Sequence, residues 1–141
     1  MKIQVYLSGQ IIFSNYSEAF NLCNKSYFGE VVHGKIQYSF TEALYLVEKN
    51  KIEVLSASGK IIPKKELMKK LQSLDKRILI KYAAFRDLRD KGYTVKTALK
   101  FGADFRVYDK GQKPGKQHSK WIAFVDYETN KTTWNEFSAR N

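Results

Sequence analysis

The sequence predicts an α/β (α+β) fold made of two small mixed domains. Short strand-like segments come first and helices with clear periodicity follow, after which the strand pattern returns. With 43% hydrophobic residues, the 141-residue chain can bury one or two small cores. We place the boundary near Asp75, which gives an N-terminal mixed α/β domain over 1–74 and a C-terminal domain over 75–141.

The N-terminal domain opens with three β-like segments, separated by Ser, Asn and Gly turns: IQVYL (3–7), GQIIF (9–13) and EVVHG (30–34). A short helix is predicted at Tyr16–Cys23. Ser39-x-x-Glu42 forms a capping box, which predicts a helix from there to near Asn50.

A strand is predicted next at Lys51–Leu55, and Pro63 suits the start of a further helix. The apolar residues of that helix recur at core-facing spacing, at Leu67, Leu71 and Leu74.

The C-terminal domain begins with a helical run over Asp75–Lys91 that ends at Gly92, a residue suited to a left-handed cap. One apolar stripe follows this helix, through Ile78, Tyr82, Phe85 and Leu88. Ala103–Tyr108 is predicted as a strand with Ala103, Phe105 and Val107 on its core face. Its polar face then carries Asp104, Arg106 and Tyr108. Trp121–Val125 is apolar enough to form a buried strand.

The charge balance favours a polyanionic partner. Twenty-five Lys and Arg against fourteen Asp and Glu give a net charge of +11 and a pI near 9.7, so we expect nucleic acid to bind with counterion release. A generally lysine-rich composition is the alternative, and the location of the charge decides between them.

Several classes of protein are disfavoured by the composition. A membrane helix needs ~18 consecutive apolar residues, which the sequence lacks, and the first residues do not resemble a signal peptide. We therefore expect a cytoplasmic protein. The single cysteine, Cys23, and the two histidines, His33 and His118, form no zinc-ligand cluster, and we expect no metal and no cofactor.

The candidate catalytic and RNA-binding residues are concentrated around the segment DKGQKPGKQ, a basic loop between the last two predicted strands. If these strands form a hairpin, Tyr108 and His118 flank the base of the loop and can approach each other. The surrounding cations are Lys96, Lys100, Arg106, Lys110, Lys113, Lys116 and Lys120. Taken alone, such a histidine is more often a solvated bystander, and such a tyrosine more often packs. The spacing around Gly115-Lys116 is one residue short of a phosphate loop and leads into a strand, so we reject that interpretation.

Residues 81–125, KYAAFRDLRDKGYTVKTALKFGADFRVYDKGQKPGKQHSKWIAFV, closely resemble the core of the archaeal tRNA-intron (tRNA-splicing) endonuclease family. Upstream, SFTEALYLVEKNKIEV and IIPKKEL resemble that family's N-terminal domain. The resemblance implies a nuclease-like C-terminal domain, with a mixed sheet flanked by helices. It also implies that Tyr108 is the general base and His118 the general acid. Arg106, with its copy on a partner subunit, is implied to stack on a base of the RNA.

The family pattern also includes a lysine that stabilises charge, on a helix beyond Asn141, so by this resemblance we expect the C-terminal domain to lack its last helix and strand. Thr133-x-x-Glu136 is a capping box, which predicts a helix from near Trp134. Three explanations remain open: the sequence is part of a longer chain, a partner chain supplies the missing element, or Lys120 or Lys131 replaces the lysine. Arg140 is a candidate for a second RNA-binding arginine.

By this resemblance the protein is a catalytic-type subunit that cuts precursor tRNA at intron–exon junctions of bulge-helix-bulge shape. The 2′-OH attacks the adjacent phosphorus without a metal, leaving 2′,3′-cyclic phosphate and 5′-OH ends. The RNA-binding candidates are Arg106, Lys110, Lys113, Lys116 and Arg140. Because each intron is cut twice, we expect a homo- or hetero-oligomer with a related subunit. The alternative is a non-catalytic subunit of the same complex that positions RNA.

Overall fold

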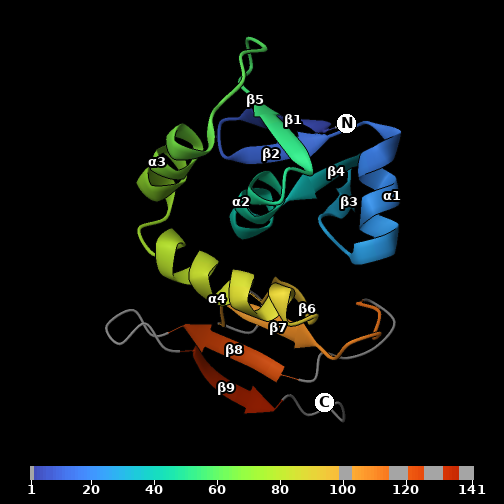
Figure 1. The fold of residues 1–141 in the computed structure, drawn as a ribbon, viewed down its shortest axis with the longest axis vertical. Coiled ribbons are helices and arrows are strands. Elements are labelled where there is room, and N and C mark those ends of the chain that lie inside the picture. Colours follow the sequence, from blue (N-terminus) through green and yellow to red (C-terminus); the bar gives the residue numbers. More distant parts are fainter. Residues whose placement is uncertain (1, 99–102, 115–120, 126–131, 137–141) are drawn as a thin grey trace. The chain divides into compact units, whose positions relative to one another are not determined.

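The computed structural model describes residues 2–98, 103–114 and 121–125, and the backbone of 132–136. The chain separates into two compact units, Met1–Ile78 and Leu79–Asn141 (Figure 1). The N-terminal unit combines three helices with one sheet, and the described part of the C-terminal unit combines one helix with one sheet, which confirms the predicted two-part α+β fold.

The N-terminal unit is built on a five-stranded sheet with the order β3-β4-β2-β1-β5. Only β1 and β5 run parallel, and the other neighbours are antiparallel, so this sheet is mixed. Its strands are β1 (Ile3–Ser8), β2 (Ile11–Ser14), β3 (Glu30–Val32), β4 (Lys35–Tyr38) and β5 (Ile52–Leu55). The three predicted β-like segments correspond to β1, β2 and β3, while β4 was not predicted.

Three helices accompany this sheet: α1 (Ser17–Ser26), α2 (Phe40–Glu48) and α3 (Lys64–Leu74). Helix α1 packs against β4, α2 packs against β5, and α3 packs against α2. Alternate strand residues, among them Val5, Ile12 and Ile36, are completely buried. The residues between them form an opposite face that stays at least partly exposed.

The predicted capping box at the start of α2 is present. Glu42 accepts hydrogen bonds from the backbone N–H and the hydroxyl of Ser39, each at 3.0 Å, while its own N–H donates to the Ser39 hydroxyl. The same carboxylate accepts the Gly29 N–H at 2.8 Å. Glu42 is 3% exposed, so it is a buried carboxylate that joins the helix start to a loop. Burial, followed by the Glu42 carboxylate, raises the pKa of the nearby Tyr38 hydroxyl.

The C-terminal unit contains α4 (Ile78–Asp90) and a sheet with the order β6-β7-β8-β9. Its strands are β6 (Thr94–Thr97), β7 (Phe105–Tyr108), β8 (Trp121–Val125) and β9 (Thr132–Glu136). All neighbouring pairs are antiparallel, so the mixed pairing expected here is absent from the described strands. The helix predicted from Trp134 is also wrong, because Trp134 lies in β9, opposite Ala123 of β8.

Helix α4 lies along one face of this sheet (Figure 1). Its predicted stripe is buried, at 1–4% exposure for Ile78, Tyr82, Phe85 and Leu88. The rings of Phe85 and Phe105 lie 5.8 Å apart, which joins the helix to β7. Gly92 follows the helix with a φ of 98°, as predicted for the cap.

In α3 of the N-terminal unit, by contrast, one predicted core residue is wrong: Leu74 is 42% exposed and does not belong to the core.

Candidate functional site

Arg106 and Tyr108 lie on the same face of β7. The Arg106 guanidinium carbon is 6.0 Å from the centre of the Tyr108 ring. The intervening Val107 and the preceding Phe105 are at most 2% exposed, on the face that α4 covers. The predicted alternation is therefore present for Arg106 and Tyr108. Asp104, which was expected on the same face, precedes the strand, and its carboxylate lies 4.0 Å from Lys81 of α4.

Cross-strand register extends this second face over the neighbouring strands. Lys96 of β6 and Ile122 of β8 are the register partners of Arg106, and Thr94 is the partner of Tyr108. The Arg106 Nε donates a 2.8 Å hydrogen bond to the Thr97 carbonyl. This bond fixes one edge of the guanidinium group, while its planar faces remain suited to stacking on a nucleobase.

Tyr108 is more enclosed than a residue on a polar face was expected to be, with only 2% of its surface exposed. Its neighbours Thr94 and Lys96 are also nearly buried, at 8% and 9%. The tyrosine ring therefore contributes to packing as well as presenting a hydroxyl group. A substitution that removes the ring would disturb the fold together with any chemistry.

The predicted hairpin is present, since β7 and β8 are antiparallel with Val107 opposite Trp121. Residues 109–120 therefore connect the strand that ends at Tyr108 to the strand that begins at Trp121. A turn begins this connection: the Gln112 N–H donates to the Asp109 carbonyl at 3.1 Å, and the Gln112 side chain accepts the Asp109 N–H at 3.0 Å. Gly111 in this turn has a φ of 83°, which glycine adopts without strain.

Lys110 is directed away from Arg106 and Tyr108. Its ammonium group lies 5.7 Å from the centre of the Tyr93 ring, and that ring meets Trp121 edge to face at 5.6 Å. Trp121 pairs with Val107 and so belongs to the opposite face of the sheet. Lys113 is exposed in the loop. The other predicted site residues lie outside the described residues, namely His118, Lys116 and Arg140, as do Lys100, Lys120 and Lys131.

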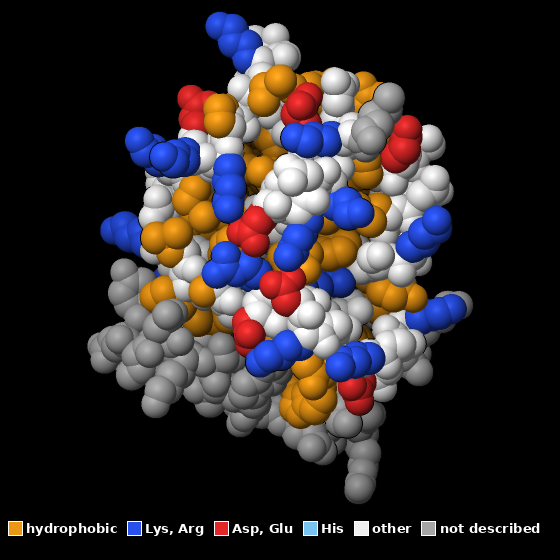
Figure 2. Space-filling model, in the orientation of Figure 1, with side chains coloured by type: hydrophobic (Ala, Val, Ile, Leu, Met, Phe, Trp, Pro, Cys, Tyr) orange, Lys and Arg blue, Asp and Glu red, His pale blue; other side chains and the backbone are white. Residues whose placement is uncertain are grey.

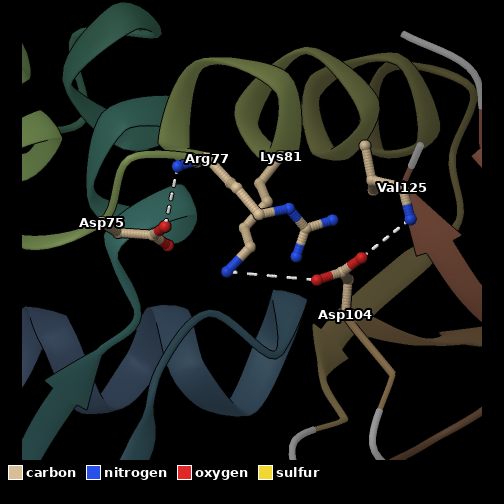
Figure 3. A network of polar contacts seen from close by, with 5 residues as sticks. All are labelled: Asp75, Arg77, Lys81, Asp104 and Val125. Atoms are coloured by element: carbon tan, nitrogen blue, oxygen red, sulfur yellow. Dashed lines mark hydrogen bonds and ion pairs between the residues drawn. The ribbon is translucent and has the colours of Figure 1, made fainter. Parts of the chain in front are cut away.

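Asp104 connects several elements of the C-terminal unit, a role that sequence reasoning did not assign. Its carboxylate accepts the Val125 N–H at 2.7 Å and lies 4.0 Å from the Lys81 ammonium group (Figure 3). The Asp104 N–H also donates to the Ala123 carbonyl at 3.1 Å. One carboxylate thus connects α4, the approach to β7 and the end of β8. The only signal in the sequence was its position on the polar face, two residues before Arg106.

Positive charge is spread over the described surface. Figure 2 shows Lys and Arg side chains distributed across the visible face with fewer acidic side chains between them. This distribution provides a broad field that attracts a polyanion, but does not by itself mark one binding groove.

The described residues contain neither a cluster of metal ligands nor a membrane-spanning helix. No group of three or more His, Cys, Asp or Glu side chains in the described residues could hold a metal ion. None of the helices in the described part of the chain has the length and apolar character needed to cross a membrane.

Comparison with known families gives a match for each unit. Residues 3–68 match the tRNA intron endonuclease N-terminal domain, and residues 78–140 match the tRNA intron endonuclease catalytic C-terminal domain. Together the two matches cover most of the chain, including β7 and the connection that follows it.

Individual relatives agree with these matches. A tRNA-splicing endonuclease of Thermococcus kodakarensis is 45% identical over 136 residues, which cover 96% of this chain and 79% of the relative. The tRNA-splicing endonuclease of Nanoarchaeum equitans is 44% identical over 106 residues, covering 71% of this chain and 68% of the relative. That of Methanococcus maripaludis is 35% identical over 123 residues, covering 87% and 69%.

Proposed function

The chain belongs to the tRNA intron endonuclease family and is an RNA endonuclease of tRNA splicing, and we propose that it cuts precursor tRNA at bulge-helix-bulge junctions through Tyr108 and His118. The observation that carries this proposal is the pairing of Arg106 with Tyr108 on one face of β7. This strand leads directly into the connection that contains His118.

The proposed reaction uses the nucleophile that RNA itself carries. Tyr108 acts as the general base and removes the proton from the 2′-OH, and the 2′ oxygen attacks the adjacent phosphorus. The bond from phosphorus to the 5′ oxygen breaks, and His118 donates a proton to that departing oxygen. The products are a 2′,3′-cyclic phosphate and a 5′-OH, so DNA, which lacks the 2′-OH, cannot react.

Arg106 supports this chemistry from the same face of β7 as Tyr108. Its guanidinium plane can stack on an unpaired base of the bulge, which would hold the scissile phosphate near the tyrosine. We assign phosphate contacts along the RNA to Lys110, Lys113, Lys116 and Arg140.

We further propose that the active form is a homo- or hetero-oligomer, since the two ends of one intron require two cuts. Recognition of RNA shape, instead of base edges, fits the broad positive field, because side chains cannot enter the narrow major groove of A-form RNA. A cytoplasmic location follows from the proposed substrate.

The decisive experiment is cleavage of a bulged precursor tRNA in EDTA by the parent and two variants. We expect the parent to cut, and Tyr108→Phe and His118→Ala to lose cleavage while RNA binding is retained. Phenylalanine is the appropriate replacement at position 108 because it keeps the buried ring. Tyr16→Phe is the matched control, because this exposed tyrosine lies in the N-terminal unit.

Cutting at the parental rate by either active-site variant would reject that residue's role. If the parent binds the bulged RNA without cutting, and gains no activity with a related subunit, the RNA-positioning alternative replaces the catalytic one.

A further inference from the structure

The open face of the N-terminal sheet contains a pocket of about 410 Å³ that the proposed cleavage reaction does not use. It lies over β2, β3 and β4, on the face opposite the buried Ile12 and Ile36. Its lining includes Ile11, Phe13, Val32, His33, Lys35 and Gln37. Ile11 is 48% exposed, so the pocket presents apolar surface to solvent.

The pocket combines an aromatic floor with a cation. The Lys35 ammonium group lies 4.7 Å from the centre of the Phe13 ring, and Phe13 is itself 6.0 Å from the ring of Tyr6. Among the described residues no carboxylate belongs to the pocket lining, and the nearest one along the sheet is Glu30, the register partner of Gln37. An apolar ring surface beside a positive charge, with the Gln37 amide within the same pocket, fits a ligand that has a flat base and an anionic group.

The rim of the pocket is formed by a tight turn between β3 and β4. Val32 pairs with Lys35, so His33 and Gly34 alone make the turn, with φ values of 50° and 76°. Asn or Gly is the usual residue at the first position of such a turn. A histidine here brings an imidazole, a second group that can bind phosphate, to the same rim as Lys35.

We propose that this pocket binds one unpaired nucleotide of the RNA. Lys35, whose ammonium group lies over the Phe13 ring, turns with His33 to the phosphate, and the base takes its place on the ring. The inference rests on the proposed function in taking RNA as the ligand. It adds a binding site in the N-terminal unit, in a different unit from Arg106 and Tyr108. We favour a nucleotide over a protein partner because the described lining combines the Phe13 ring with the side chains of Lys35 and His33.

The test measures binding of a precursor tRNA that carries 2′-deoxyribose at both junctions, so that it cannot be cut. Fluorescence anisotropy of the labelled RNA is titrated at several salt concentrations, which separates the contribution of charge to the affinity from that of base stacking. Lys35→Gln should weaken binding about fivefold and reduce the slope of log K against log salt by about 0.7, the value for one phosphate contact on a single strand. Phe13→Leu should weaken binding by about tenfold with the slope unchanged, because a base loses its aromatic partner.

Two further variants serve as controls. His33→Asn removes the imidazole but keeps a residue that accepts a positive φ, so a weaker affinity at an unchanged unfolding midpoint assigns the loss to binding. Lys60→Gln removes an exposed lysine from the turn after β5, outside the pocket lining, and should leave affinity and slope close to those of the parent.

The location is tested by photocrosslinking the same RNA carrying 5-iodouridine, a reagent that reacts with stacked aromatic side chains. We expect crosslinked peptides that contain Phe13 or Tyr6, and their loss in Phe13→Leu. If Lys35→Gln and Phe13→Leu both bind like Lys60→Gln, or crosslinks form only in the C-terminal unit, the nucleotide site is wrong. Unchanged RNA binding together with loss of a co-purifying protein in these variants would assign the pocket to a protein partner and overturn the proposal.

Failure of this inference is distinguishable from failure of the cleavage mechanism. His118→Ala should lose cleavage and keep Lys35-dependent binding. Lys35→Gln should keep the parental cleavage rate at saturating RNA and raise only the RNA concentration at which cleavage is half-maximal.

Discussion

Removing the Asp104 carboxylate is expected to destabilise the C-terminal unit more than any change to its surface ion pairs. In Asp104→Ala the Val125 N–H loses an acceptor at 2.7 Å, and Val125 is only 5% exposed. A hydrogen bond to a charged group contributes about 1.5–3 kcal/mol. The Lys81 ammonium group at 4.0 Å adds at most about 1 kcal/mol, because the pair remains partly exposed. The expected loss is therefore about 1.5–4 kcal/mol.

The measurement is urea unfolding followed by tryptophan fluorescence. Both tryptophans, Trp121 and Trp134, belong to the C-terminal unit, so the signal reports the unit that contains Asp104. Asp104→Asn should lose less stability than Asp104→Ala, because an amide oxygen can still accept the Val125 N–H. In a unit of this size a loss of 2 kcal/mol lowers the melting temperature by at least about 8 °C.

Asp87→Asn is the matched control. Asp87 forms a 3.0 Å ion pair with Lys91, but both side chains are 61% exposed, so the pair contributes little. We expect its unfolding midpoint to remain close to that of the parent. If Asp104→Ala unfolds at the same urea concentration as Asp87→Asn, the bond to Val125 does not stabilise the sheet and the reasoning fails.

Three further predictions concern other residues. Arg106→Ala should weaken binding of a bulged RNA by ~1–3 kcal/mol, the value of one lost stack; equal affinity for parent and variant in titrations would remove Arg106 from the site. Glu42→Ala should lower the free energy of unfolding by about 2–4 kcal/mol in denaturant titrations, because the buried Gly29 N–H loses its acceptor and the cap of α2 is lost. Gly29→Ala should destabilise more than Gly59→Ala: both glycines have positive φ, but a Cβ at Gly29 would lie 2.5 Å from Ile36, while none meets an atom within 4 Å at Gly59. Equal thermal midpoints would contradict this.

Local signals in the sequence were sufficient to predict most of the helices. The Ser39 and Glu42 capping box marks the start of α2 because its hydrogen bonds are made within four residues. The stripe of α4 was likewise predicted because one apolar face of a helix has a fixed spacing. Leu74 follows the same spacing at the end of α3 and is nevertheless exposed, since the spacing does not tell where a packing partner ends.

Short strands were harder to predict than helices. Strands β4 and β6 were not predicted, although β2, β5 and β7 have the same length of four residues and were predicted, so length alone does not decide. At Trp134 a capping signal predicted a helix, but five register pairs with β8 place the segment in a strand. Long-range pairing is not encoded in the segment itself, so a local signal fails there.

The site was predictable where it depends on strand geometry alone. Alternation along β7 correctly put Arg106 and Tyr108 on one face. The burial of Tyr108 and the turning of Lys110 towards Tyr93 depend on neighbouring strands, and the sequence did not predict either. The anchoring role of Asp104 is also a product of tertiary contacts.

The spacing of Arg106 and Tyr108 on one strand restricts how this protein can change over evolution. A single inserted or deleted residue between them would rotate one side chain through the sheet to the face covered by α4, since adjacent strand residues point in opposite directions. The chain length of β7 is thus as constrained as its two side chains. Insertions are far easier to accommodate in the turn that begins at Asp109, where the strand has already ended and no register with β6 has to be kept.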